Sequence, residues 1–151
     1  MAKFIYKLQS LLNIKEKLEE QEKTAYGLAK AVLNEEEEKL AQLVAKKNRY
    51  VEEKRQKMSE LLDVLELSRL EQAVRSTEML IDEQVLVVKR AEKAVALAQI
   101  RLENAMKERK IQEKLRENAF EEFKKEMEAA EQQEINELVT FRFRKQKEKE
   151  G

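Results

Sequence analysis

The acidic run Glu35–Glu38 is the densest group of side chains in this sequence that could do chemistry. Four adjacent carboxylates raise the question of an acidic metal cluster. Consecutive residues of a helix point in different directions, however, so four Glu in a row cannot converge on one ion. We therefore interpret the run as a solvated helix face and predict no metal site.

The other reactive residue types give no better starting point for catalysis. The 151 residues include no Cys and no His, which removes thiol ligands, disulfides and the commonest general base. Thirty-one Asp and Glu residues guarantee close carboxylate pairs by chance, but a two-helix protein offers no water-excluding pocket in which a carboxyl pKa would rise. Gly27 stands alone within a helical pattern and forms no phosphate-binding loop. We predict that the chain is not an enzyme and uses no cofactor.

The composition predicts long helices. Charged residues make up 41% and hydrophobic residues 42% of the chain, Pro is absent and Gly occurs twice, which is typical of a coiled coil. Lys plus Arg balance Asp plus Glu at 31 each, so no uniformly basic face indicates a nucleic-acid partner. No apolar run approaches the ~20 residues of a membrane span, and no signal peptide is recognisable at the N-terminus. We expect a soluble, cytoplasmic protein.

The clearest coiled-coil pattern lies between residues 88 and 105. Its apolar residues alternate at spacings of three and four, which is the heptad pattern of a helix that packs on a partner. They are Val88, Ala91, Val95, Ala98, Leu102 and Ala105. Because every second one is Ala, the partner helix can approach closely.

A second apolar pattern in residues 3–33 offers that partner. Its members recur every seven residues at Phe4, Leu11, Leu18, Ala25 and Val32. If the chain reverses direction, this stripe meets the first one, with Ala25 level with Leu102 and Phe4 near Phe123. We predict these contacts.

The chain reversal is expected between Met58 and Leu70, where apolar residues face all directions. Two capping boxes lie here, Asp63 with Glu66 and Ser68 with Glu71. One unbroken helix, dimerising through the whole heptad pattern as a generic scaffold, is the alternative.

Our fold prediction is all-α: a rod-like, antiparallel two-helix coiled-coil hairpin whose second helix is longer than the first. It forms a single domain over residues 1–151, with a helix at about 3–58, a turn at about 59–68, a helix at about 69–143 and a C-terminal tail, 144–151, that frays or is held by a partner.

Two regions carry more apolar side chains than a two-helix seam needs. In residues 79–88 they cover most of the helix circumference, so we expect a further contact there. At the ends of the chain, aromatic residues lie among basic ones, namely Phe4, Tyr6, Lys7, Phe141, Arg142, Phe143 and Arg144. These ends are either solvated termini or a tip that inserts into an electronegative or aromatic-lined socket.

Several motifs resemble those of the flagellar export protein FliJ family. The opening KFIYKLQSLLNIKE (3–16) is similar to the start of that family. The later AMKERKIQEKLRE (105–117), Phe123 and EQQEINEL (131–138) resemble its C-terminal signature. Asn136 stands where similar members often have Asp. The resemblance covers nearly the whole chain.

This resemblance implies a coiled-coil component of the flagellar type III export apparatus that acts like the stalk of a rotary ATPase. The end with both termini would enter the export ATPase ring, and the region towards the hairpin tip would meet the export gate. Implied partners are the export ATPase and its regulator, the cytoplasmic domain of the gate, and export chaperones. The implied location is cytoplasmic, peripheral at the inner face of the cell membrane at the flagellar base, through these partners only.

Two positions align with the gate-facing residues of that family. They are Leu43 and Tyr50, while Lys46 replaces the aromatic residue between them. Each has a second interpretation, packing in or near the seam, and the sequence leaves both open.

Overall fold

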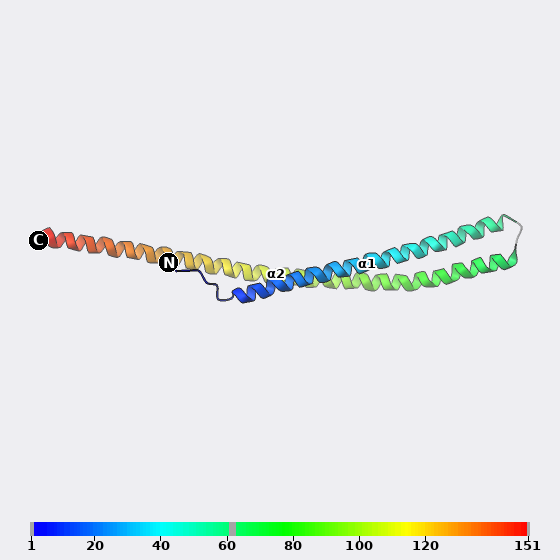
Figure 1. The fold of residues 1–151 in the computed structure, drawn as a ribbon, viewed down its shortest axis with the longest axis horizontal. Coiled ribbons are helices and arrows are strands. Elements are labelled where there is room, and N and C mark those ends of the chain that lie inside the picture. Colours follow the sequence, from blue (N-terminus) through cyan, green and yellow to red (C-terminus); the bar gives the residue numbers. More distant parts are fainter. Residues whose placement is uncertain (1, 61–62, 151) are drawn as a thin grey trace. The chain divides into compact units, whose positions relative to one another are not determined.

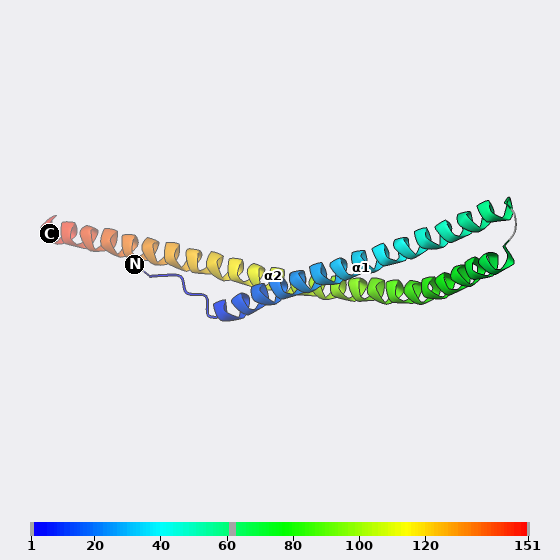
Figure 2. The same ribbon diagram turned by 45° about the vertical axis from the view of Figure 1, so that its right-hand side comes forward.

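The computed structural model describes residues 2–60 and 63–150, and within them the chain forms two helices in an antiparallel hairpin (Figures 1 and 2). Helix α1 spans Gln9–Met58 (50 residues) and helix α2 spans Val64–Glu150 (87 residues). The predicted fold class is confirmed: all-α, with the second helix longer than the first. None of the described helices has a stretch long and apolar enough to cross a membrane.

Local signals explain where the helices begin and end. Residues 2–6 are not helical, and α1 opens with a hydrogen bond from the backbone N–H of Gln9 to the carbonyl of Tyr6 (3.2 Å). At the other end of α1, the hydroxyl of Ser59 donates to the carbonyl of Gln56 (2.7 Å). Asp63 caps α2, because its carboxylate accepts the N–H of Leu65 at 3.1 Å.

The helix bounds differ in part from those expected from the sequence. Helix α1 begins at Gln9 rather than near residue 3, and α2 begins at Val64 rather than near 69. Asp63 therefore acts as the cap, whereas Ser68 lies inside α2. The expected turn at 59–68 also includes residues 61–62, which lie outside the described residues.

Residues 144–150, which we expected to fray or to be held by a partner, are helical and continue α2. The ammonium group of Lys145 lies 5.4 Å from the ring centre of Phe141, and that of Lys147 lies 5.8 Å from the ring centre of Phe143. Cation–π pairs at this spacing stabilise the helix that carries them.

The described residues divide into two compact units. Unit 1 contains residues 2–18 and 106–150, and unit 2 contains residues 19–60 and 63–105. The single domain expected from the sequence stays a prediction.

In unit 2 the seam of α2 is the one predicted. Val88, Ala91, Ala98 and Ala105 are buried, with exposed fractions of 4–8%. The seam extends towards the turn through Thr77, whose hydroxyl donates to the carbonyl of Ala73 (2.7 Å), and Leu70. The Ala residues that recur every seven positions therefore lie inside the seam.

The predicted seam of α1 is wrong by one residue. Leu18 and Val32 are exposed (37% and 50%), as is Ala25, so these three residues do not line the seam. That Ala25 lies level with Leu102 stays a prediction. The side chains of unit 2 that are buried or half-buried on α1 lie at a strict three–four alternation: Glu19, Glu22, Tyr26, Ala29, Leu33, Glu36, Leu40, Leu43, Lys47, Tyr50, Lys54 and Lys57.

A physical reason for the shift lies farther along α1. The stripe that contains Ala25 and Val32 continues to Lys39 and Lys46, whereas the observed seam continues to apolar residues such as Leu40. Two lysines of the observed seam have partners on α2: Lys47 pairs with Glu78 (3.3 Å) and Lys54 with Glu71 (3.3 Å). Such pairing lowers the cost of placing charge beside a seam.

Candidate protein-interaction sites

Unit 1 contains an aromatic cluster that holds the N-terminal segment against α2. The ring of Phe4 lies 5.2 Å from that of Phe120 in an edge-on arrangement and 5.4 Å from that of Phe123. Both centroid distances are within the range of favourable aromatic pairs. The sequence-based prediction that Phe4 lies near Phe123 is confirmed.

An open groove of about 660 Å³ flanks this cluster. It is lined by residues 4–8 and by Ala119, Glu122, Phe123 and Glu126 of α2. Tyr6 is half-buried there, and its hydroxyl is buried without a hydrogen-bond partner in the described residues. Lys7 is exposed. Deeper in unit 1, Lys15 of α1 pairs with Glu108 of α2 at 2.8 Å.

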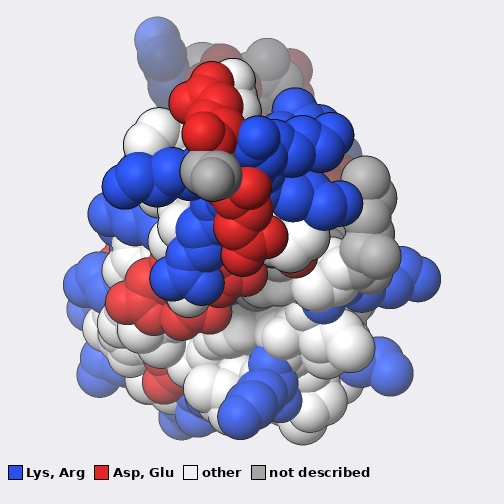
Figure 3. Space-filling view, turned by 90° about the vertical axis from the view of Figure 1, so that its left-hand side faces the viewer, with Lys and Arg blue, Asp and Glu red and all other residues white. Residues whose placement is uncertain are grey.

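Beyond the aromatic cluster, α2 continues with no packing partner in unit 1. Every residue from 128 to 150 is exposed, a segment about 35 Å long at 1.5 Å per residue. Phe141 and Phe143 expose 59% and 63% of their surface, next to Arg142 and Arg144. A view onto the C-terminal end shows Lys and Arg side chains around much of its rim, interspersed with acidic ones (Figure 3).

The residues expected at a single ring-inserting end therefore fall in two places. Phe4, Tyr6 and Lys7 lie beside residues 119–126 of α2. Phe141 lies roughly 27 Å farther along that helix than Phe123, at 1.5 Å per residue. The structure does not bring the two groups together.

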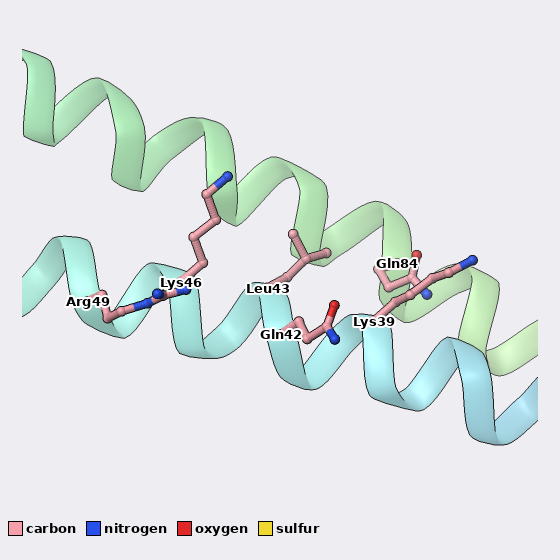
Figure 4. Close-up of a pocket in the computed structure, with 6 residues that line it drawn as sticks. All are labelled: Lys39, Gln42, Leu43, Lys46, Arg49 and Gln84. Atoms are coloured by element: carbon pink, nitrogen blue, oxygen red, sulfur yellow. The ribbon is translucent and has the colours of Figure 1, made fainter.

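In unit 2, Leu43 and Tyr50 both occupy the seam of α1 and are half-buried. Leu43 lines an open groove of about 500 Å³ together with Lys39, Gln42, Lys46, Arg49 and Gln84 (Figure 4). The ammonium group of Lys46 lies 6.0 Å from the ring centre of Tyr50. Each side chain thus packs in the seam while leaving part of its surface open to a partner.

A polar contact joins the two helices beside this groove. The Gln84 side-chain amide donates to the carbonyl of Glu36 (3.0 Å) and to its carboxylate (2.6 Å). The hydrogen bond from Gln84 lowers the pKa of Glu36, an effect that Lys39 reinforces and burial opposes. Glu36 thus remains charged within the seam.

A second charged contact joins the two helices of unit 2, near the end of α1 and the start of α2. Lys57 of α1 pairs with Glu66 of α2, and this hydrogen bond raises the pKa of Lys57. Among the described residues no group of three or more acidic side chains could hold a metal ion.

The sequence-based reasoning missed the basic groove. Lys39, Gln42, Lys46 and Arg49 alternate at spacings of three and four, so they share one face of α1. That spacing was a usable signal. Whether this face borders α2 depends on the rotation of α1 about its axis. The sequence pattern placed the seam of α1 one residue too early, so the rotation was predicted wrongly.

A family model decides the classification: the one described as Flagellar FliJ protein matches residues 4–148. The chain belongs to this family. It is accordingly a coiled-coil protein associated with type III export. No curated protein matches the chain.

A solved structure supports the fold of this FliJ-family chain. The protein, described as a YscO homologue from Chlamydia trachomatis, is similar with a TM-score of 0.52 and 20% sequence identity. The match covers 89% of this chain and 90% of that one. At this identity the likeness concerns the fold alone.

Proposed function

We propose that this chain is a non-enzymatic stalk and adaptor of the flagellar type III export apparatus, which couples the export ATPase ring to the export gate. The observation that carries the proposal is the unpartnered end of α2. Residues 128–150 are all exposed, yet they include Phe141 and Phe143 flanked by Arg142 and Arg144. The family to which the chain belongs supports the setting.

A lone helix with exposed aromatic residues fits the central opening of a ring. An isolated helix gains no tertiary packing, so it benefits from a partner that covers its apolar side chains. With its side chains a helix is about 10–12 Å across. Aromatic residues and Arg are the types most enriched at the energetic centres of protein interfaces.

The N-terminal segment has a different part in this proposal. Phe4 is already engaged with Phe120 and Phe123, so it braces α2 where the unpartnered segment starts. Tyr6 and Lys7, next to the groove, would contact the rim of the ring. Arg142 and Arg144 would face acidic or carbonyl groups inside it.

In this proposal, Leu43 and Tyr50 contact the export gate. Both are only half-buried in the seam, so the exposed part of each is free to contact the cytoplasmic domain of the gate. We place the chain at the inner face of the cell membrane through these partners, in the cytoplasm, with the ATPase regulator and the export chaperones as further partners.

The test mixes the purified chain with the hexameric export ATPase of the same organism. We expect co-elution in size-exclusion chromatography and a changed rate of ATP hydrolysis. The double variant Phe141→Ala, Phe143→Ala should lose both effects while keeping its helical circular-dichroism spectrum. A matched control replaces Val64 and Leu65, which are equally exposed (76% and 67%) but lie in the first turn of α2.

Neither association nor a change in ATP hydrolysis for the unmodified chain would refute the proposal. A generic scaffold, the alternative from the sequence, forms a homodimer of long helices and ignores the ATPase. Light scattering separates the two, since the scaffold has twice the mass of one chain.

A further inference from the structure

Two neighbouring rows of side chains on α1 have the spacing of a seam between residues 18 and 36. The row that faces α2 is the observed seam, whose members in this stretch are Glu19, Glu22, Tyr26, Ala29, Leu33 and Glu36. One residue earlier lies a second row, all of it exposed, which we call the outer stripe: Leu18, Gln21, Ala25, Leu28, Val32 and Glu35. Both rows keep the three–four alternation that a seam requires.

The outer stripe is the more apolar row in this part of α1. Its residues Leu18, Leu28 and Val32 expose 37%, 64% and 50% of their surface. In the seam, by contrast, Glu19 is only 5% exposed, with Lys23 of the same helix 3.7 Å from its carboxylate. Burying a carboxylate costs free energy, and leaving Leu and Val in water forgoes hydrophobic stabilisation. This part of α1 would therefore gain from turning the outer stripe towards α2.

The next part of α1 favours the observed rotation instead. There the outer stripe continues with Lys39 and Lys46, whereas the seam continues with Leu40 and Leu43. The ion pairs that join the seam lysines of α1 to α2 also lie in this part. The two parts of one helix thus favour rotations that differ by one residue.

The two preferences meet in the acidic run Glu35–Glu38. Like charges three residues apart weaken a helix, and Lys39 pairs with two members of the run, Glu35 (3.8 Å) and Glu36 (3.3 Å). Gln84 holds Glu36 in the seam through two hydrogen bonds (3.0 and 2.6 Å). A single π-bulge in this run would supply the one residue by which the two rotations differ, and it would leave the helix otherwise intact.

The facing side of α2 offers little resistance to such a rotation. Every second seam position there is a buried Ala, namely Ala91, Ala98 and Ala105. The side chain of Ala extends only one carbon from the backbone, so it interlocks less with the facing helix than Leu or Ile does. The helix opposite can therefore turn without first unpacking long side chains at these positions.

We propose that residues 19–33 of α1 alternate between two rotations on α2, the observed one and a shifted one in which the outer stripe lies in the seam. In the shifted rotation each seam place passes to the preceding residue, as from Leu33 to Val32. This part of α1 turns by about 100° and advances by about 1.5 Å, the rotation and rise of one residue. The switch changes the side chains that α1 presents to its surroundings without unfolding either helix, and it does not rest on the stalk function.

Disulfide formation between introduced Cys residues reports the rotation, because the chain has no Cys of its own. Lys47 pairs with Glu78, which follows the buried Thr77, so residue 47 lies level with residue 77. Three heptads farther along both helices, Tyr26 lies level with Ala98. A disulfide at this level requires the two Cα atoms to come within about 7 Å with their side chains facing each other.

The variant Ala25→Cys with Ala98→Cys, which we call the reporter pair, detects the shifted rotation. The matched control is Lys46→Cys with Thr77→Cys. It holds the same two heptad positions as the reporter pair, but in the part of α1 that keeps its rotation. Under mild oxidation of the full chain, we expect the intramolecular disulfide of the reporter pair to form about tenfold faster than that of the control. Tyr26→Cys with Ala98→Cys, the pair of the observed rotation, should also form its disulfide.

A second variant weakens the shifted rotation alone. Leu28→Gln with Val32→Gln changes only exposed positions of the observed rotation, so the chain keeps its fold. It should slow the reporter disulfide about fivefold or more, because the shifted seam loses two apolar side chains. Val44→Gln with Val51→Gln, at exposed positions outside the outer stripe (40% and 44%), should leave the reporter rate unchanged. Circular dichroism of the reduced proteins checks that every variant stays helical.

Three results would overturn the proposal. Equal rates for the reporter and control pairs would mean that the reporter measures only the ordinary motion of a flanking residue. No reporter disulfide, in a chain where the pair of the observed rotation does form one, would mean that α1 has a single rotation. A reporter rate that Leu28→Gln with Val32→Gln leaves unchanged would mean that the outer stripe does not enter the seam.

Discussion

Gln84 of α2 donates two hydrogen bonds to Glu36 of α1, one to its main-chain carbonyl at 3.0 Å and one to its carboxylate at 2.6 Å. This contact gives Glu36, a charged residue of the α1 seam, a hydrogen-bond donor on the facing helix. We expect Gln84→Ala to lower the free energy of unfolding by about 1 kcal/mol, because the Glu36 carboxylate loses a donor. Urea denaturation followed by circular dichroism measures the change.

The control for this variant is Gln99→Ala. The Gln99 amide bonds only Glu103 of its own helix, on the exposed surface at 3.4 Å. This control should leave the free energy of unfolding nearly unchanged. Equal losses in the two variants would contradict a specific role for Gln84.

The same contact predicts a dependence of stability on pH. The pKa of Glu36 in the folded chain lies below its usual value of 4.5, chiefly because Gln84 bonds the charged form. The unfolded chain therefore binds the proton more readily, and stability is lost as the pH falls below about 4.5 through the folded pKa. Acid titration of the urea midpoint should show this loss, and Gln84→Ala should reduce it.

The contact of Lys57 with Glu66 should make the stability fall as the pH rises in the alkaline range. The pKa of Lys57 is raised above the usual 10.5, chiefly by the hydrogen bond with Glu66. The contribution to stability is complete below 10.5 and is lost as the pH rises through the folded pKa. Glu66→Gln should flatten the alkaline part of the profile and leave the acidic part as it is, whereas an unchanged alkaline profile would contradict the assignment.

Gly27 offers a stabilising substitution. It lies inside α1, and a methyl group at its Cα would meet no atom within 4 Å. Gly27→Ala should therefore raise the free energy of unfolding by about 0.5–1 kcal/mol, because Ala has the higher helix propensity. Thermal unfolding checks this, and a lower midpoint would mean that residue 27 is not in an open helical position.

Phe4→Ala should release the N-terminal segment from α2. Phe4 is half-buried against Phe120 and Phe123, so we expect a loss of about 1–2 kcal/mol, less than for a fully buried Phe. Hydrogen exchange of the amides of residues 9–12 should become faster. Phe143→Ala, on the exposed part of α2, removes only the cation–π pair with Lys147, so it should lower the stability by about 0.5 kcal/mol or less and leave the exchange of residues 9–12 unchanged.

The sequence was sufficient to predict one side of the seam and not the other. On α2, the heptad from Val88 to Ala105 gives the observed seam: Val88, Ala91, Ala98 and Ala105 are buried, and Val95 and Leu102 are half-buried. On α1, Leu18, Leu28 and Val32 are as apolar as the residues that are inside. The correct stripe contains Glu19, Glu22 and Lys47, which only their surroundings in the folded chain make acceptable there.

The one-residue error in the seam of α1 explains why the basic groove was missed although the contact of Phe4 with Phe123 was predicted. The contact of Phe4 with Phe123 depends on how far along the two segments pair, and the sequence was sufficient for that. The basic groove depends on the rotation of α1, because a rotation by one residue moves Lys39 and Lys46 between seam and flank. Lys46 was noted in the sequence only as a departure from the family's aromatic residue.

In the proposed function, the exposed end of α2 enters the export ATPase ring. The most direct measurement places a photo-cross-linking amino acid at Phe143, and separately at Leu65, and identifies the cross-linked ATPase peptides by mass spectrometry. We predict that Phe143 cross-links to residues lining the central opening of the hexamer and that Leu65 does not. Cross-links from Phe143 only to the outer surface of the ring, or none at all in a complex that co-elutes, would contradict the account.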